Sequence, residues 1–206
     1  MEPRNPEPRN PETSEPFPLS LLPKHSVFLD RDGVINEDSP DYIKGWDEFR
    51  FIPGSRSAIA ALTRSGVRVF VVSNQSGVNR GLIPLPVLEQ MHRRMTAAVE
   101  EAGGRIEAIF YCPHRPDEDC SCRKPRPAML DNARRIHGVD LSRSAMIGDS
   151  ARDILAARRA GCALSVLVKT GKGVAAEKEL ADSGVRPDHV AENLDSAVHW
   201  ILSQWF

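Results

Sequence analysis

The sequence has no long run of apolar residues and no excess of charge of either sign. A membrane-spanning helix needs roughly 20 consecutive apolar residues, and since no segment approaches that length we predict no membrane contact. The 27 basic and 28 acidic side chains nearly cancel, which leaves a formal net charge of -1. Nonspecific nucleic-acid binding depends on a surplus of Lys and Arg, so no nucleic-acid partner is expected. The N-terminal residues also lack the basic start and apolar middle of a secretory signal, and the cytoplasm is therefore the expected location.

Residues that favour helices and strands are scarce at the start of the chain, where proline dominates. The first residues read MEPRNPEPRNP, a short tandem repeat. Proline at this density disrupts helices and strand pairing, and the segment offers little apolar surface for burial. We therefore predict a disordered tail over residues 1–23 and a folded domain over residues 24–206. A domain of that length can bury a substantial core without disulfide bonds.

Cysteine is rare, with four in 206 residues, but three of the four are clustered. Cys112, Cys120 and Cys122 lie close together in the sequence, and His114 lies among them. In a reducing compartment such a cluster indicates a metal site rather than disulfides, and three cysteines with one histidine are a common tetrahedral zinc set. Four protein ligands would close the coordination shell, so the predicted Zn²⁺ is structural. The alternative is a group of reduced side chains without a metal, and Cys162 is predicted to be a buried apolar residue.

Short apolar runs alternate with segments of helical periodicity from His25 onward. This alternation predicts an α/β fold whose mainly parallel sheet is covered by helices on both faces. Met91 and Met95 are assigned to the apolar face of a helix over residues 85–102. The expected strands are residues 26–29, 67–72, 106–111, 144–147 and 163–168, with a short extended piece near Val190. The other expected helices are residues 53–64, 127–136, 151–160, 174–183 and 194–203.

Polar residues follow the predicted strands at the points where the strands end. Asp30 and Asp32 follow the first strand, Ser73 follows the second, and Asp149 follows a later one, with Asp153 four positions further on. Because the carboxyl ends of parallel strands meet at one edge of a sheet, these side chains should converge. Carboxylates held close together favour a cation between them, and Mg²⁺ prefers oxygen ligands and a substrate phosphate. Helix capping is the alternative for Asp149 and Asp153, but it does not account for the convergence.

Four motifs resemble, in order, the signature motifs of the haloacid dehalogenase superfamily of phosphatases: Asp30-Arg31-Asp32-Gly33, Ser73-Asn74-Gln75, Lys124, and Gly148-Asp149 with Asp153. The resemblance spans residues 25–170 and implies a doubly wound, Rossmann-like fold; no insertion long enough for a large cap domain is present. It implies that Asp30 attacks phosphorus to form an aspartyl-phosphate, and that Asp32 acts as the general acid and base. Asp149, the Asp30 carboxylate and the Asp32 carbonyl would bind Mg²⁺. Ser73 and Lys124 would neutralise charge on the phosphoryl oxygens, with Asp153 in a supporting position.

The cysteine cluster and the residues that follow it narrow the resemblance. Cys112-Pro113-His114 and Cys120-Ser121-Cys122-Arg123-Lys124-Pro125 are similar to the zinc-loop subgroup of this superfamily, which contains D,D-heptose 1,7-bisphosphate phosphatases and histidinol-phosphate phosphatases. The resemblance implies an enzyme that removes the 7-phosphate of D-glycero-D-manno-heptose 1,7-bisphosphate, on the route to nucleotide-heptose precursors of surface glycans. We expect a monomer. Zinc would position Arg123 and Lys124 at the rim, where Arg123 contacts the phosphate that stays. The other expected substrate contacts are Asp38, Tyr42, Asn74, Gln75 and Ser76.

Three alternatives remain open at this point. Histidinol-phosphate phosphatases share nearly every motif, and the second phosphate of the heptose substrate favours the heptose enzyme only through Arg123. A polynucleotide 3′-phosphatase has a similar segment after its second strand, but the near-neutral charge of this chain argues against it. A catalytically inactive zinc-loop binding module would tolerate loss of the nucleophile or the acid, whereas both Asp30 and Asp32 are present.

Overall fold

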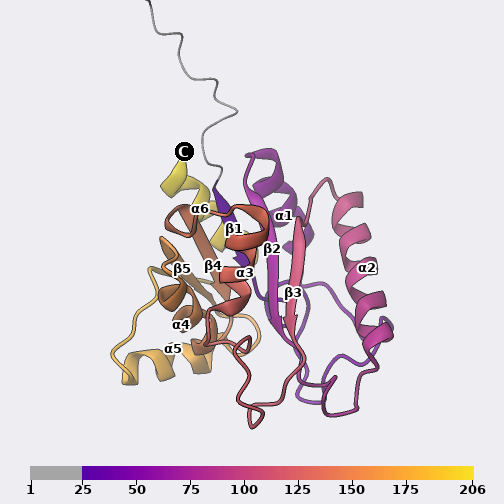
Figure 1. The fold of residues 1–206 in the computed structure, drawn as a ribbon. Helices are drawn as coiled ribbons and strands as arrows, with labels where there is room; N and C mark the ends of the chain where they lie inside the picture. Colours follow the sequence, from indigo (N-terminus) through magenta and orange to yellow (C-terminus); the bar gives the residue numbers. More distant parts are fainter. Residues whose placement is uncertain (1–24) are drawn as a thin grey trace, which may run out of the picture.

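In the computed structural model, which describes residues 25–206, six parallel strands form one sheet (Figure 1). The expected tail, residues 1–23, lies outside the described residues. The strand order is β3-β2-β1-β4-β5-β6, so the direction of winding reverses between β1 and β4. This is the doubly wound order in which ligands bind at the carboxyl ends of the strands, beside the reversal point. The bounds are β1 (Ser26–Leu29), β2 (Arg68–Asn74), β3 (Ala108–Cys112), β4 (Ser144–Gly148), β5 (Leu164–Val168) and β6 (His189–Ala191).

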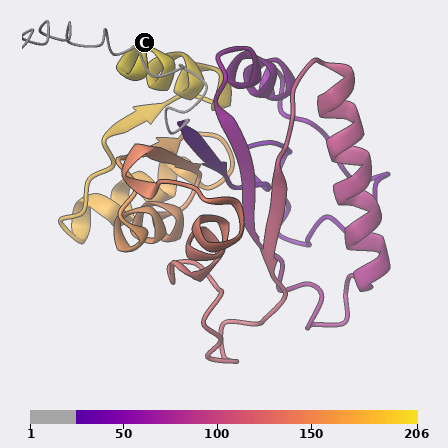
Figure 2. The same cartoon turned by 45° about the horizontal axis from the view of Figure 1, so that its top comes forward.

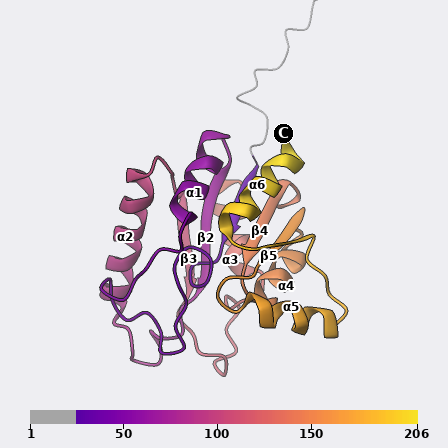
Figure 3. The same cartoon turned by 180° about the vertical axis from the view of Figure 1, so that it is seen from behind.

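Helices cover both faces of the sheet, as the sequence predicts. One face packs against α1 (Ser55–Arg64), α2 (Leu85–Glu101) and α6 (Leu194–Trp205), and Figure 3 shows α1 and α6 in front of the strands. The opposite face packs against α3 (Ala128–His137), α4 (Ala151–Ala160) and α5 (Gly173–Asp182). The sheet is therefore buried on both sides, which is why its strands read as nearly continuous apolar runs.

The alternation of side chains along β1 divides the core between the two faces. Val27 and Leu29 pack in the cluster under α1, α2 and α6, whereas Phe28 packs on the α3 side. Met91 and Met95 are fully buried in the first of these clusters, which confirms their assignment to the core. Leu85 is 41% exposed at the start of α2, although its helical spacing predicts burial. The remaining elements begin and end within about two residues of the predicted bounds, which is the usual uncertainty at helix ends.

The loops at the carboxyl ends of the strands carry most of the irregular structure. Residues 30–54 connect β1 to α1, and residues 113–127 connect β3 to α3; Figure 2 shows the second loop extending beyond the sheet. Neither loop contains a helix or a strand of the sheet, so no cap domain covers this edge. Within residues 25–206, no helix has the length and apolar character that crossing a bilayer requires.

Candidate active site

The end of β1 places two carboxylates at the reversal point of the sheet. Asp30 follows Leu29 directly, and its Oδ1 accepts a hydrogen bond of 2.6 Å from the Arg31 amide. The chain then turns at Gly33, which has a φ of +81° that favours glycine. A Cβ at Gly33 would lie 2.1 Å from Asp149 Oδ2, so the turn also lets β1 and β4 bring their carboxylates together.

Asp30, which is partly exposed, forms a cluster with the buried carboxylates of Asp149 and Asp153. One oxygen of each lies within 4.8 Å of the others. Burial, followed by repulsion from its neighbours, raises the pKa of Asp149 to about 8. The pKa of Asp30 rises to about 6 because burial and the nearby carboxylates outweigh the attraction of Lys124. Carboxylates that resist ionisation in this way are relieved by a divalent cation, and an all-oxygen donor set suits Mg²⁺. These residues therefore fit the predicted metal.

Lys124 is a buried cation that joins this cluster from the β3–α3 loop. Its Nζ lies 3.0 Å from Asp30 Oδ2 and 2.6 Å from Asp153 Oδ1, and it donates a bond of 2.7 Å to the Val72 carbonyl. Burial opposes its charge, but Asp153 and Asp30 together raise the pKa of Lys124 above its usual value. A permanently charged ammonium beside Asp30 can neutralise a phosphoryl group there without rearrangement.

Asp153 performs the capping role and the supporting role at the same time. Its Oδ2 accepts bonds of 3.0 Å from the Ser150 amide and 2.7 Å from the Ser150 hydroxyl at the start of α4. Its Oδ1 is the oxygen that contacts Lys124. The side chain is completely buried, and both of its oxygens face donors. Its geometry therefore suits holding Lys124 more than it suits binding the metal.

Asp32 is held by an unusually complete set of donors. Arg31 donates to both carboxylate oxygens at 2.8–3.2 Å, Asn36 donates to Oδ1 at 2.9 Å, and Gln75 donates to Oδ2 at 2.7 Å. Burial opposes ionisation, but Arg31 and the hydrogen bonds lower the pKa of Asp32 below its usual value. Arg31 is 1% exposed and its Nη1 lies 3.4 Å from His92 Nε2. In this geometry Asp32 is an ionised group that can accept a proton.

The end of β2 supplies polar groups that face the same centre. The Ser73 hydroxyl is buried and accepts a bond of 2.8 Å from Gln75 Nε2, the same nitrogen that reaches Asp32. The Asn74 side chain donates a bond of 3.2 Å from Nδ2 to the Lys124 carbonyl and accepts a bond of 3.1 Å at Oδ1 from the Lys124 amide. Asn74 thus ties the end of the β3–α3 loop to β2.

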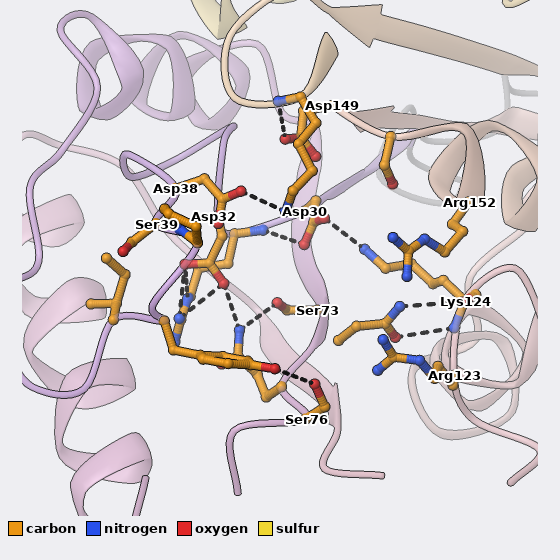
Figure 4. A pocket seen from close by; sticks show the side chains of 18 of the residues that line it. Asp30, Asp32, Asp38, Ser39, Ser73, Ser76, Arg123, Lys124, Asp149 and Arg152 are labelled. Atoms are coloured by element: carbon orange, nitrogen blue, oxygen red, sulfur yellow. Dashed lines mark hydrogen bonds and ion pairs between the residues drawn. The ribbon is translucent and has the colours of Figure 1, made fainter. Parts of the chain in front are cut away.

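A cavity of about 360 Å³ lies over these groups (Figure 4). Its lining includes every predicted catalytic and substrate-contacting residue: Asp30, Asp32, Asp38, Tyr42, Ser73, Asn74, Gln75, Ser76, Arg123 and Lys124, together with Asp149. Asp38 is paired with Lys172 Nζ at 2.6 Å, and Tyr42 Oη lies 3.5 Å from Ser76 Oγ. The structure therefore brings together residues from loops that are far apart in the sequence, while Asp153 lies behind Lys124, outside the cavity lining.

The cysteine cluster lies at the base of the β3–α3 loop. Cys112 Sγ is 3.5 Å from both His114 Nδ1 and Cys120 Sγ, and Cys122 Sγ is 3.3 Å from His114 Nδ1 and 3.7 Å from Cys120 Sγ. In a tetrahedral site with Zn–S of about 2.3 Å and Zn–N of about 2.0 Å, ligand atoms are separated by roughly 3.5–3.8 Å. All four cysteines are free of disulfides. The four residues consequently fit a zinc ion, with no ligand position left for substrate.

Sequence reasoning missed several groups that the structure brings to the site. Arg31 and Asn36 donate to Asp32, and His92 lies behind Arg31. Lys172 pairs with Asp38, and its backbone N–H donates to Asp149 Oδ2 at 2.9 Å. Arg152 lines the cavity. Arg31 stands between two motif residues, and a fully buried arginine there could have been inferred from its need for a carboxylate. His92 gave no such signal, because helical spacing alone assigns it to the core.

Comparison with known proteins gives consistent similarities. Residues 121–197 match the family model described as HAD-hydrolase-like. The chain is 54% identical over 148 residues to a D-glycero-beta-D-manno-heptose-1,7-bisphosphate 7-phosphatase of Pseudomonas aeruginosa, covering 72% of this chain and 83% of that protein. It is 43% identical over 179 residues to the protein of the same name from Bordetella bronchiseptica, covering 86% and 98%.

A solved structure extends the similarity to three dimensions. The crystal structure of D,D-heptose 1,7-bisphosphate phosphatase from B. bronchiseptica, complexed with magnesium and phosphate, matches this fold with a TM-score of 0.81 at 41% identity. The match covers 87% of this chain and 99% of that one. The similarity therefore includes the sheet and the loops at its carboxyl edge.

Proposed function

Because the chain belongs to the D-glycero-beta-D-manno-heptose-1,7-bisphosphate 7-phosphatase family of HAD-like hydrolases, we propose that it hydrolyses the 7-phosphate of that sugar bisphosphate. The product keeps its 1-phosphate, as a nucleotide-sugar precursor requires. The observation that carries this proposal is the position of Asp30, which lies between the Asp149 carboxylate and the Lys124 ammonium at the floor of the cavity. The relatives named above favour this substrate over histidinol phosphate.

In the first step a carboxylate oxygen of Asp30 attacks the phosphorus at carbon 7. The P–O bond to the sugar breaks, and an aspartyl-phosphate forms on Asp30. Lys124 and the Ser73 hydroxyl bind the equatorial phosphoryl oxygens and offset the charge that develops there. Mg²⁺, held by Asp30, Asp149 and the main-chain carbonyl of Asp32, supplies further neutralisation of the phosphoryl oxygens when it is bound.

Asp32 moves the proton in both steps. In the first step Asp32 enters protonated, with the proton that it took from water in the preceding turnover and with one of its bonds from Arg31, Asn36 or Gln75 loosened. The leaving oxygen takes that proton as it departs. In the second step the Asp32 carboxylate accepts a proton from water as the water oxygen attacks the phosphorus of the aspartyl-phosphate. The P–O bond to Asp30 breaks, which releases inorganic phosphate and frees the Asp30 carboxylate. The donors that lower the pKa of Asp32 keep it in the ionised form that this second step requires.

The cavity walls select the substrate in place of a cap domain. The loop of residues 30–54 contributes Asp38 and Tyr42, the end of β2 contributes Asn74, Gln75 and Ser76, and the β3–α3 loop contributes Arg123. A structural Zn²⁺ on Cys112, His114, Cys120 and Cys122 gives the last of these walls its shape. We propose that the enzyme acts as a monomer on this small phosphorylated sugar.

The test measures phosphate release from heptose 1,7-bisphosphate with and without Mg²⁺, in parallel with histidinol phosphate, and with Asp30→Asn as the blank. Removal of the 7-phosphate leaves a sugar 1-phosphate, which is not a reducing sugar, so a reducing-end assay on the product identifies the bond that was cleaved. We expect Mg²⁺-dependent release with no gain of reducing ends. Preference for histidinol phosphate, or the appearance of reducing ends, would contradict the proposal.

A further inference from the structure

A second hollow of about 260 Å³ adjoins the cavity over Asp30, between the β3–α3 loop and α4. The two hollows share four lining residues: Pro116, Arg123, Lys124 and Arg152. Figure 4 shows Arg152, Lys124 and Arg123 on the same side of the cavity, across from Asp38 and Ser39. Two guanidinium groups therefore stand at the boundary between the reaction centre and the space beyond it.

The neighbouring arginines of the second hollow already have partners. Arg115 pairs with Asp117 and Glu118 at 3.3 and 3.2 Å. Arg126 contacts Asp119 and the Cys120 carbonyl, and Arg159 donates to the Pro125 carbonyl at 3.0 Å. These contacts account for three of the five arginines around this hollow.

Arg123 and Arg152 differ from those three. Arg123 donates from Nη1 to the His114 carbonyl at 3.1 Å, a contact that fixes the side chain to the zinc loop without neutralising it. Within residues 25–206, the Arg152 guanidinium has no hydrogen bond and no ion pair. Arg152 also lies in the first turn of α4, where the helix dipole disfavours a cation, and it opposes the charge of nearby Lys172. A guanidinium with no anionic partner, beside another cation and a helix N-terminus, is suited to binding an anionic ligand.

Within residues 25–206, three arginines that line the cavity have no carboxylate partner: Arg80, Arg123 and Arg152. Of these, only Arg123 and Arg152 also line the second hollow. Asp30, Asp149 and Asp153 carry up to three negative charges, of which Lys124 offsets one and a divalent cation would offset two. Asp38 is offset by Lys172 and Asp32 by Arg31. Arg123 and Arg152 have no carboxylate partner and line both hollows, so they can meet a phosphate group other than the one that reacts.

We propose that Arg152, on α4, acts with Arg123 to bind the phosphate that stays on the substrate, so that the enzyme selects sugars phosphorylated at both ends. This inference rests on the proposed function and assigns a residue that the sequence motifs did not single out. Guanidinium groups bind phosphate through paired hydrogen bonds in a fixed geometry, and two of them on separate elements also fix the direction in which the sugar lies. The same pair would repel the ammonium group of histidinol phosphate.

The test compares Arg152→Gln and Arg152→Lys on two substrates, heptose 1,7-bisphosphate and heptose 7-phosphate, which lacks the second phosphate. For Arg152→Gln we expect KM for the bisphosphate to rise about 10- to 100-fold, because a charge-assisted contact is lost, with a much smaller change for the monophosphate. Arg152→Lys should recover only part of the loss, since an ammonium cannot make the paired contact. In the double variant, the changes in KM caused by Arg152→Gln and Arg123→Gln should be non-additive on the bisphosphate, because both residues bind the same phosphate. On the monophosphate the two changes should be additive.

Arg158→Gln is the matched control, because this substitution removes the same charge from the same helix. Arg158 lines neither hollow. Equal effects of Arg152→Gln on both substrates, or an effect no larger than that of the control, would overturn the role of Arg152 while the proposed function stands. A wild-type enzyme that hydrolyses p-nitrophenyl phosphate but shows no preference for the bisphosphate would overturn both. Circular dichroism and a thermal melt establish that each variant is folded.

Discussion

Replacing Asp153 by Asn tests how the buried Lys124 is held. The change keeps the size of the side chain but removes its charge and turns one acceptor into a donor. If the amide nitrogen replaces Oδ1 it faces the Lys124 ammonium, and if it replaces Oδ2 it faces the Ser150 amide, so each orientation places two donors together. No orientation of the amide restores both contacts.

The expected effects follow from this geometry. Breaking a fully buried ion pair costs about 3–5 kcal/mol, and relief of the repulsion that Asp153 exerts on Asp30 and Asp149 returns part of that cost. We expect a net loss of about 2–3 kcal/mol, which lowers the urea midpoint by roughly 1–1.5 M at a slope of about 2 kcal/mol per M. Because Lys124 is no longer fixed beside Asp30, kcat should fall about 100-fold.

The assay measures kcat at increasing Mg²⁺, together with urea unfolding, and uses Asp149→Asn as the matched charge-loss control. If Asp153 holds Lys124, excess Mg²⁺ does not restore the activity of Asp153→Asn. Asp149→Asn should instead recover partly at high Mg²⁺, because Asp149 has no contact with Lys124. Recovery of Asp153→Asn by Mg²⁺, or a wild-type kcat with an unchanged midpoint, would refute the reasoning and make Asp153 a metal ligand.

Three further predictions concern pH, packing and zinc. In Mg²⁺-free buffer the folded protein keeps protons on Asp149 and Asp30, whose pKa values are raised to about 8 and about 6, whereas the unfolded chain releases them near pH 4. Stability should therefore fall as pH rises from 5 to 8; urea midpoints at each pH measure this, and a flat profile would contradict it. Gly33→Ala places a Cβ 2.1 Å from Asp149 Oδ2 and should abolish activity, whereas Gly138→Ala, with a similar positive φ and open space around its Cβ, should cost only about 1 kcal/mol in a thermal melt. Cys122→Ser should raise KM by a larger factor than it lowers kcat in steady-state kinetics, because the zinc loop forms a wall of the substrate cavity. A fall in kcat as large as the rise in KM would contradict this role of the loop.

The sequence predicts most of this fold because its signals are local. Strands buried on both faces read as apolar runs, and helices show helical spacing of apolar residues, so alternation alone indicates the parallel sheet. The strand order required the family resemblance, because periodicity does not determine which strands are neighbours. The exposed Leu85 shows where the local signal fails: helical spacing predicts an apolar face but not where the neighbouring elements stop covering it.

The site residues likewise divide into those that a local sequence signal predicts and those that only the folded structure identifies. Asp30, Asp32 and Asp149 follow strands in the sequence and are predicted by that position, whereas Lys124, in a loop, is predicted only by the family resemblance. Arg152 was not, because nothing in its immediate sequence distinguishes it from a solvated charge on a helix. Its significance depends on a cavity shared with a loop about 30 positions earlier in the chain, and no local pattern encodes that neighbour.

The position of Lys124 also changes the expected importance of zinc. Sequence reasoning predicts that the zinc loop fixes Lys124, because Lys124 follows Cys122 so closely. In the structure four anchors from outside the loop hold it: Asp153 on α4, Asp30 after β1, the Val72 carbonyl on β2, and the Asn74 side chain, which binds the Lys124 backbone. None of these contacts passes through the cysteines. Arg123, by contrast, is fixed by the His114 carbonyl within the zinc loop itself. Under the proposed function, a zinc ion on this loop would hold Arg123 more directly than Lys124. Loss of the metal is then expected to impair substrate selection more than the phosphoryl-transfer chemistry.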